Sequence, residues 1–173
     1  ILGGLYSPGI FTGISTLTEV RLPANTSIGN YAFSNCSNLE TIELAAGNSG
    51  SIGNYAFQNT ALSQIVIPEG YTSIGDSAFK GCTALTSVSL PATLSKLNTT
   101  SFNNCSSLAT MTVADGNKSF VMENGVLYNS DKTAIYFIPS GLTTFEIPSG
   151  MTYSSSLISL LSGITTLQSI TVA

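Results

Sequence analysis

The chain has 173 residues, of which 43% are hydrophobic and only 8% are charged, and its net charge is −4. We expect one domain over residues 1–173 with a sizeable core. No apolar run approaches the roughly 20 residues that would span a bilayer. The five basic residues are scattered singly, which excludes the Lys/Arg stripe of a nucleic-acid-binding protein.

Residues 1–10 show no repeat, and their Gly-Gly and Pro-Gly pairs predict an irregular start. Residues 11–119 repeat one pattern, which is fullest at 28–44 as IGNYAFSNCSNLETIEL. Its phenylalanines recur after 24, 22 and 23 residues, at Phe33, Phe57, Phe79 and Phe102. A period in the low twenties lies within the range of leucine-rich repeats, and it predicts stacked coils that share one buried spine.

The second half of each copy ends with apolar residues two apart, the spacing of a strand that buries alternate side chains. Segments 41–44, 64–67 and 87–90 are therefore predicted to be short parallel strands, one per coil, about 4.8 Å apart. The first half is too short for a long helix, so we expect turns, a short second strand or a 3₁₀ piece there. The predicted fold class is a β-rich leucine-rich-repeat solenoid.

The period is interrupted at residues 120–141, where Asn124-Gly125 lies between two apolar segments and predicts a β-hairpin or meander. The pattern resumes over residues 142–173 as terminal coils. The last unit places these residues in the columns of the repeat: Leu161, Ile164, Leu167, Ile170 and Val172.

This repeat resembles the BspA-like leucine-rich repeat family over nearly the whole chain, roughly residues 11–172. The resemblance is carried by the SIGxxAF segments at 27–33, 51–57 and 73–79, and by the interruption GVLYNSDKT at 125–133. It is supported by the residues that follow these segments, which are Cys36, Leu39, Cys82, Leu85, Leu90 and Pro91. The resemblance implies a cell-surface or secreted protein, mostly bacterial, that adheres to host or matrix proteins or to other cells.

The composition argues against catalysis. The chain contains no histidine, which excludes Ser-His-Asp and Cys-His arrangements. Glu19 and Glu43 are expected on neighbouring strands, close enough in principle for a carboxylate pair, although solvated surface acids are the simpler interpretation. We expect no enzyme, no cofactor and no metal site.

The cysteines Cys36, Cys82 and Cys105 share one column of the repeat. The same column holds Ile14 and Ile164, which favours buried apolar packing for the thiols. A disulfide between Cys82 and Cys105, in adjacent coils, is the alternative, and a metal or catalytic role is the third.

An asparagine column precedes the cysteines, with Asn35, Asn59 and Asn104 joined by Gly81. A turn that requires a left-handed backbone is one interpretation, and a role in ligand contact is the other.

The surface most available for recognition is the outward side of the strands. It lacks an aromatic platform, so stacking of sugars there is not favoured. We expect two parallel columns on one continuous sheet: Glu19, Arg21, Thr41, Glu43, Gln64, Val66, Ser87, Ser89, Thr110, Thr112, Thr144 and Glu146, followed by Ser169 and Thr171. Tyr128, Tyr136 and Phe137 in the interruption are a second candidate.

Two functions are compatible with these features. The first is a non-enzymatic adhesion or binding module that recognises an extracellular protein through the strand face. The second is a rigid structural spacer of a larger surface protein, with no ligand of its own. The chain opens at Ile1 without a methionine or a signal-peptide pattern, so we expect a processed protein or a part of a longer one.

Overall fold

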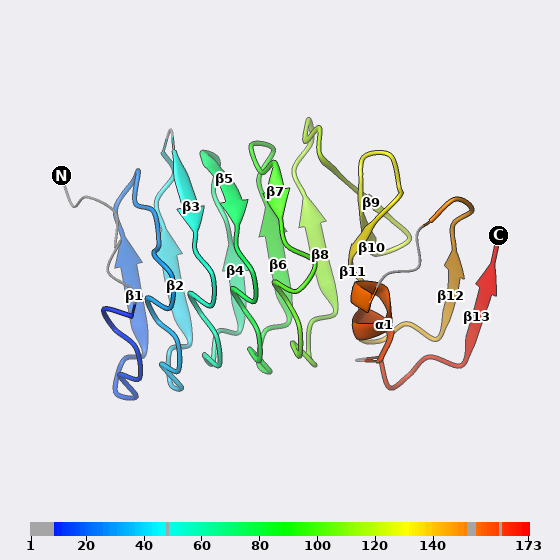
Figure 1. Ribbon diagram of the computed structural model, residues 1–173. Helices are drawn as coiled ribbons and strands as arrows, with labels where there is room; N and C mark the ends of the chain where they lie inside the picture. Colours follow the sequence, from blue (N-terminus) through cyan, green and yellow to red (C-terminus); the bar gives the residue numbers. More distant parts are fainter. Residues whose placement is uncertain (1–8, 48, 152–154, 163) are drawn as a thin grey trace.

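Each copy of the repeat forms one coil of a solenoid in the computed structural model, which describes residues 9–47, 49–151, 155–162 and 164–173 (Figure 1). We number the coils 1 to 5 by their phenylalanines, Phe11, Phe33, Phe57, Phe79 and Phe102. The predicted strand of each coil is present. These strands are β1 (Glu19–Leu22), β2 (Thr41–Leu44), β4 (Gln64–Val66), β6 (Ser87–Leu90) and β8 (Thr110–Val113). All their pairings are parallel, β1 with β2 and then β4 with β6 and β8, so the predicted fold class is confirmed.

The first half of the repeat contributes a second parallel sheet. Its strands are β3 (Gly50–Ile52), β5 (Tyr71–Ile74) and β7 (Lys96–Leu97), in the order β3-β5-β7. They run opposite to the strands of the first sheet (Figure 1), because each coil reverses direction between its two strands. Of the three options that the sequence leaves for this half, the short second strand followed by turns is the one that forms.

The interruption is a three-stranded antiparallel meander of β9 (Phe120–Glu123), β10 (Val126–Asn129) and β11 (Ile135–Phe137), as predicted. Asn124 and Gly125 have φ of 50° and 81°, the left-handed pair that a two-residue hairpin turn needs. Both faces of the meander are buried. Leu127 and Phe137 pack into the core of coils 1 to 5, whereas Tyr128 and Ile135 pack into a second core beneath the C-terminal segment.

The C-terminal segment departs from the prediction. β12 (Thr144–Ile147) pairs with β13 (Ser169–Val172) in the predicted register, Phe145 beside Ile170 and Ile147 beside Val172. Residues Ser155–Ser162 form the helix α1, where the sequence pattern predicts a degraded coil. The helix forms because Leu157, Leu160, Leu161 and Ile164 recur at the spacing of one helical face, which packs on the second core.

The phenylalanine column is the spine of coils 1 to 5. We give this name to Phe11, Phe33, Phe57, Phe79 and Phe102, whose successive ring centroids lie 5.2, 5.4, 5.2 and 5.2 Å apart with nearly parallel planes. Phe33, Phe57 and Phe79 are at most 1% exposed. The predicted stack is therefore confirmed.

Two backbone N–H groups per coil tie each coil to the next. The N–H of the phenylalanine and the N–H two residues later both donate to carbonyls of the following coil, as in Phe57 to Ala78 (2.7 Å) and Asn59 to Lys80 (2.9 Å). The same pair of bonds forms from coil 1 to coil 2, from coil 2 to coil 3 and from coil 4 to coil 5. The coils therefore bond like strands along the axis of the solenoid, even where the chain is turning.

The asparagine column has the predicted left-handed backbone, with φ of 59° at Asn35, 56° at Asn59, 75° at Gly81 and 61° at Asn104. The turn interpretation explains the column, and a side-chain bond from Asn59 to Asn35 at 2.8 Å links two of its members. Sequence reasoning missed a second left-handed position, occupied by Tyr31, Tyr55 and Ser77.

The cysteine column consists of buried, free thiols. Each thiol donates a hydrogen bond to the phenylalanine carbonyl of the preceding coil, from Cys36 to Phe11, Cys82 to Phe57 and Cys105 to Phe79, at 3.0 to 3.1 Å. The neighbouring Cys82 thiol, together with burial, raises the pKa of Cys105 far above its ordinary value. Neutral, enclosed thiols of this kind react slowly.

Replacing Phe57 by alanine removes the central ring of the column and leaves a cavity that both neighbouring coils enclose. We expect the free energy of unfolding to fall by about 3–5 kcal/mol, as for other buried phenylalanines. Chemical denaturation measures the change. Val66→Ala is the control, since Val66 is 66% exposed and its truncation should change stability by less than about 0.5 kcal/mol. Equal effects of the two substitutions would contradict the stacked core.

Thiol titration tests the cysteine column. The folded protein should react slowly with a thiol reagent, and protein unfolded without reductant should release three thiols per chain. Release of a single thiol would establish a disulfide and overturn the description of the column as free thiols.

Candidate functional site

The strand face carries the predicted residues of coils 1 to 5 in two columns. Along each strand they alternate with buried residues such as Ile42, Ile65 and Val88. The pairing places Glu19 beside Thr41 and Arg21 beside Glu43, and it sets Ser87 between Gln64 and Thr110. The structure thus brings together ten of the predicted residues: Glu19, Arg21, Thr41, Glu43, Gln64, Val66, Ser87, Ser89, Thr110 and Thr112.

The face is not one continuous sheet, which corrects the prediction at two places. The hydrogen-bonded ladder is interrupted between β2 and β4, which belong to different sheets. It also stops at β8, because the meander and α1 lie between β8 and β12 (Figure 1). Thr144 and Glu146 therefore lie on the separate β12–β13 sheet, together with Ser169 and Thr171.

The charged residues of the strand face lie at its N-terminal end. Arg21 lies between two carboxylates, with its guanidinium 2.8 Å from Glu19 and 3.3 Å from Glu43. Its hydrogen bond with Glu19 raises the pKa of Arg21, which is already high. Arg21 thus links Glu19 and Glu43, which do not form an isolated pair of carboxylates. All three side chains are exposed, so they contribute little stability and are available to a partner.

A groove of about 340 Å³ lies where β2 and β4 separate. Its acidic residues are Glu40 and Glu43, and Ile42, Leu44 and Val66 supply apolar surface. Val66 is 66% exposed, an unusual exposure for a branched apolar side chain on a strand. The groove joins the charged end of the face, because Glu43 belongs to both.

The C-terminal half of the face is uncharged. It presents the hydroxyls of Ser87, Ser89, Thr110 and Thr112, and the Thr112 hydroxyl donates to Ser89 at 3.1 Å. These side chains offer hydrogen bonds without apolar anchors. The charged side chains and the exposed apolar surface of the strand face therefore both lie near β1, β2 and β4.

The second candidate surface is largely wrong. Tyr128 and Phe137 are only 5% and 4% exposed and belong to the two cores. Tyr136 is half-buried, packs edge-on against Phe120 at 5.1 Å, and borders a polar hollow on the β3–β5–β7 sheet. Alternation along β10 and β11 could not reveal this, because both faces of the meander are covered.

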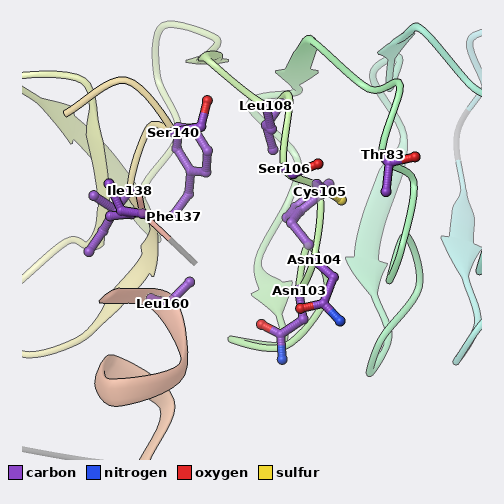
Figure 2. A pocket seen from close by; sticks show the side chains of 12 residues that line it. Thr83, Asn103, Asn104, Cys105, Ser106, Leu108, Phe137, Ile138, Ser140 and Leu160 are labelled. Atoms are coloured by element: carbon purple, nitrogen blue, oxygen red, sulfur yellow. The ribbon is translucent and has the colours of Figure 1, made fainter. Parts of the chain in front are cut away.

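Sequence reasoning also missed a cavity of about 320 Å³ between coil 5 and the segment that follows it. Figure 2 shows Asn103, Asn104 and Cys105 on one side of this cavity, and Phe137, Ile138 and Leu160 on the other. The only sequence signal was the interruption at 120, which leaves coil 5 without a regular coil above it.

Metal and membrane features complete the description. Within residues 9–47, 49–151, 155–162 and 164–173, histidine, cysteine and acidic side chains form no cluster that could hold a metal ion. The part of the chain that the structure describes also contains no helix with the length and apolar character needed to cross a membrane.

Solved structures similar to this chain are bacterial leucine-rich repeat proteins. One from Eubacterium ventriosum ATCC 27560 is 27% identical, with a TM-score of 0.72 over 82% of this chain and 38% of that chain. One from Bacteroides ovatus ATCC 8483 is 25% identical, with a TM-score of 0.55 over 95% of this chain and 33% of that one. The leucine-rich repeat protein of T. pallidum, 23% identical with a TM-score of 0.57, covers 95% of this chain and 60% of its own, and shares the fold.

This chain thus spans between one third and two thirds of the length of these proteins. A search among curated protein sequences finds no significant match. The family described as BspA type leucine rich repeat region matches residues 7–133 and 50–172, with six copies of the repeat. Together with the stacked coils and the SIGxxAF segments, this match shows that the chain belongs to the family of BspA-type leucine-rich repeat proteins.

Proposed function

We propose that this chain is a non-enzymatic binding module of a cell-surface or secreted protein, and that it recognises an extracellular protein partner through the strand face. The observation that carries the proposal is the groove between β2 and β4, where exposed apolar surface meets carboxylates at the edge of paired strands. Buried apolar anchors with a polar rim are the usual anatomy of a protein-binding site.

The chemistry of the groove indicates the kind of segment it takes. Its floor accepts one apolar side chain beside Val66, while Glu40 and Glu43 favour a neighbouring Lys or Arg. Only five basic residues occur in the chain, and the net charge of −4 favours approach of a basic partner. An extended segment with an apolar residue next to a basic one therefore fits this part of the face.

Location at the cell surface is supported by membership of the BspA-type family and by the composition. With 8% charged residues, the surface is covered largely by Ser, Thr and Asn, which is common in proteins exposed to the outside medium.

A rigid spacer without a ligand is the alternative. It is favoured by the stacked rings and by the backbone hydrogen bonds of the phenylalanine turns, which link coils 1 to 5 and make this part of the chain stiff along its axis. Stiffness serves a stalk as well as a binding module, so only binding measurements separate the two.

Binding to immobilised matrix proteins and mucus glycoproteins tests the proposal, with Val66→Asp and Glu43→Lys as variants of the groove. Each should weaken any interaction that the unmodified chain makes by about tenfold or more, because each disrupts a central anchor. Ile158→Asp and Asp115→Lys are matched controls at exposed positions outside the face, and they should change affinity less than about twofold. Loss of binding in controls and groove variants alike would contradict recognition by the strand face, and no binding by the unmodified chain would favour the spacer.

A further inference from the structure

The C-terminal end of coil 5 exposes the two backbone donors that every earlier coil uses. In coils 1 to 4, the N–H of the phenylalanine and the N–H two residues later donate to the next coil at 2.7–3.0 Å. The equivalent N–H groups of coil 5 belong to Phe102 and Asn104. Neither forms a hydrogen bond with any residue that the structure describes, although both residues line the 320 Å³ cavity.

The phenylalanine column ends at the same place. Phe79 stacks on Phe102 at 5.2 Å, and among the described residues no ring stacks on the opposite face of Phe102. Phe102 and Cys105 are 7% and 8% exposed, whereas Phe79 and Cys82 are fully buried. Both Phe102 and Cys105 line the cavity, where a sixth coil would place the next aromatic ring.

The walls of the cavity are made by side chains that do not continue the column. Leu160 of α1 lies with Phe137 and Ile138 opposite coil 5 (Figure 2), and Ile164 also lines the cavity. Coil 5 contributes both apolar groups and amide or hydroxyl groups to the lining, and none of the lining residues is acidic or basic. An uncharged occupant therefore fits, because a buried charge would have no partner. The volume is at the small end of ligand-binding pockets.

We propose that this cavity binds an aromatic residue presented by an extended partner peptide, which takes the place of the missing coil. The aromatic ring stacks on Phe102 as Phe102 stacks on Phe79. The carbonyls of the residues before and after the aromatic residue accept the N–H groups of Phe102 and Asn104, as Ser101 and Asn103 accept those of Phe79 and Gly81. Backbone bonds supply affinity and the ring supplies specificity, as in strand addition to a sheet edge. The site is separate from the strand face and does not depend on its role.

The blocked peptide acetyl-Ala-Phe-Gln-amide copies residues 56–58 and is the direct probe. Titrated into labelled protein and followed by NMR, it should shift the amide signals of Phe102 and Asn104 and slow their hydrogen exchange, with a Kd of about 0.1–1 mM for so small a contact. The same peptide with leucine in place of phenylalanine keeps both carbonyls and should bind about three- to tenfold more weakly, because it lacks the aromatic stack.

Two substitutions in α1 test whether the peptide binds in the cavity, and both leave the phenylalanine column intact. Leu160→Phe fills the cavity and should weaken the peptide at least about tenfold, while Ile158→Phe, on a side chain that is 70% exposed, should leave affinity unchanged. Melting curves of both variants verify that they are folded. The proposal is overturned if the amide signals of Phe102 and Asn104 do not respond, if the leucine peptide binds equally well, or if Leu160→Phe binds the peptide as the unmodified chain does. Variants of the strand face should leave this binding intact, so the two proposals fail independently.

Discussion

The stacking of one coil on the next, through a ring and two backbone N–H groups, is the interaction on which the structure depends. A single coil is too small to bury its phenylalanine, leucine and strand residues, or to satisfy the backbone of its turns. Each coil does both for its neighbours. This explains why the side chains at these positions vary so little from coil to coil, and why Ser101, which replaces alanine in coil 5, bonds through its hydroxyl to the Gly75 carbonyl.

Close stacking also determines where glycine is required. Gly53 and Gly75 do not adopt the left-handed backbone that glycine often supplies. A Cβ at Gly53 would lie 2.7 Å from the backbone of Gly29 in the preceding coil, and one at Gly75 would lie 2.8 Å from that of Gly53. The backbones of successive coils are therefore in contact at these corners. This contact allows the side chains of Asn30 and Asn54 to accept hydrogen bonds from backbone N–H groups of the following coil.

The repeated part of the fold could be predicted from the sequence, because the same residue type recurs at the same position of several coils and so indicates the same structural environment each time. The phenylalanine, cysteine and asparagine columns, the parallel strands β1, β2, β4, β6 and β8, and the meander all follow from spacing and turn chemistry. The left-handed backbone at Tyr31 and Tyr55 could not be predicted, since tyrosine rarely adopts it, and here the stacked rings of the two side chains, 4.9 Å apart, accompany it. Helix α1 was missed because the spacing of its leucines fits both a coil of the repeat and an amphipathic helix. Packing against the second core favours the helix.

The candidate sites, like the fold, were predictable from the sequence only where the coils are regular. Alternation along the strands identified which residues of the strand face lie opposite the buried ones, and the structure pairs them within β1–β2 and within β4–β6–β8 but not between β2 and β4. The groove between β2 and β4 and the cavity beyond coil 5 arise where stacking is imperfect, and a pattern that describes regular coils contains no information about such places. Both candidate sites therefore lie where the regular stacking of the solenoid is interrupted.

Hydrogen exchange of the unliganded protein, resolved by residue, tests the stacking of coils most directly. The amides of Phe33, Phe57 and Phe79 should be strongly and similarly protected, because each opens only when two coils separate. The amides of Phe102 and Asn104, which donate to no residue that the structure describes, should exchange much faster. Exchange of the Phe57 amide as rapid as that of Asn104 would contradict a solenoid held together from coil to coil.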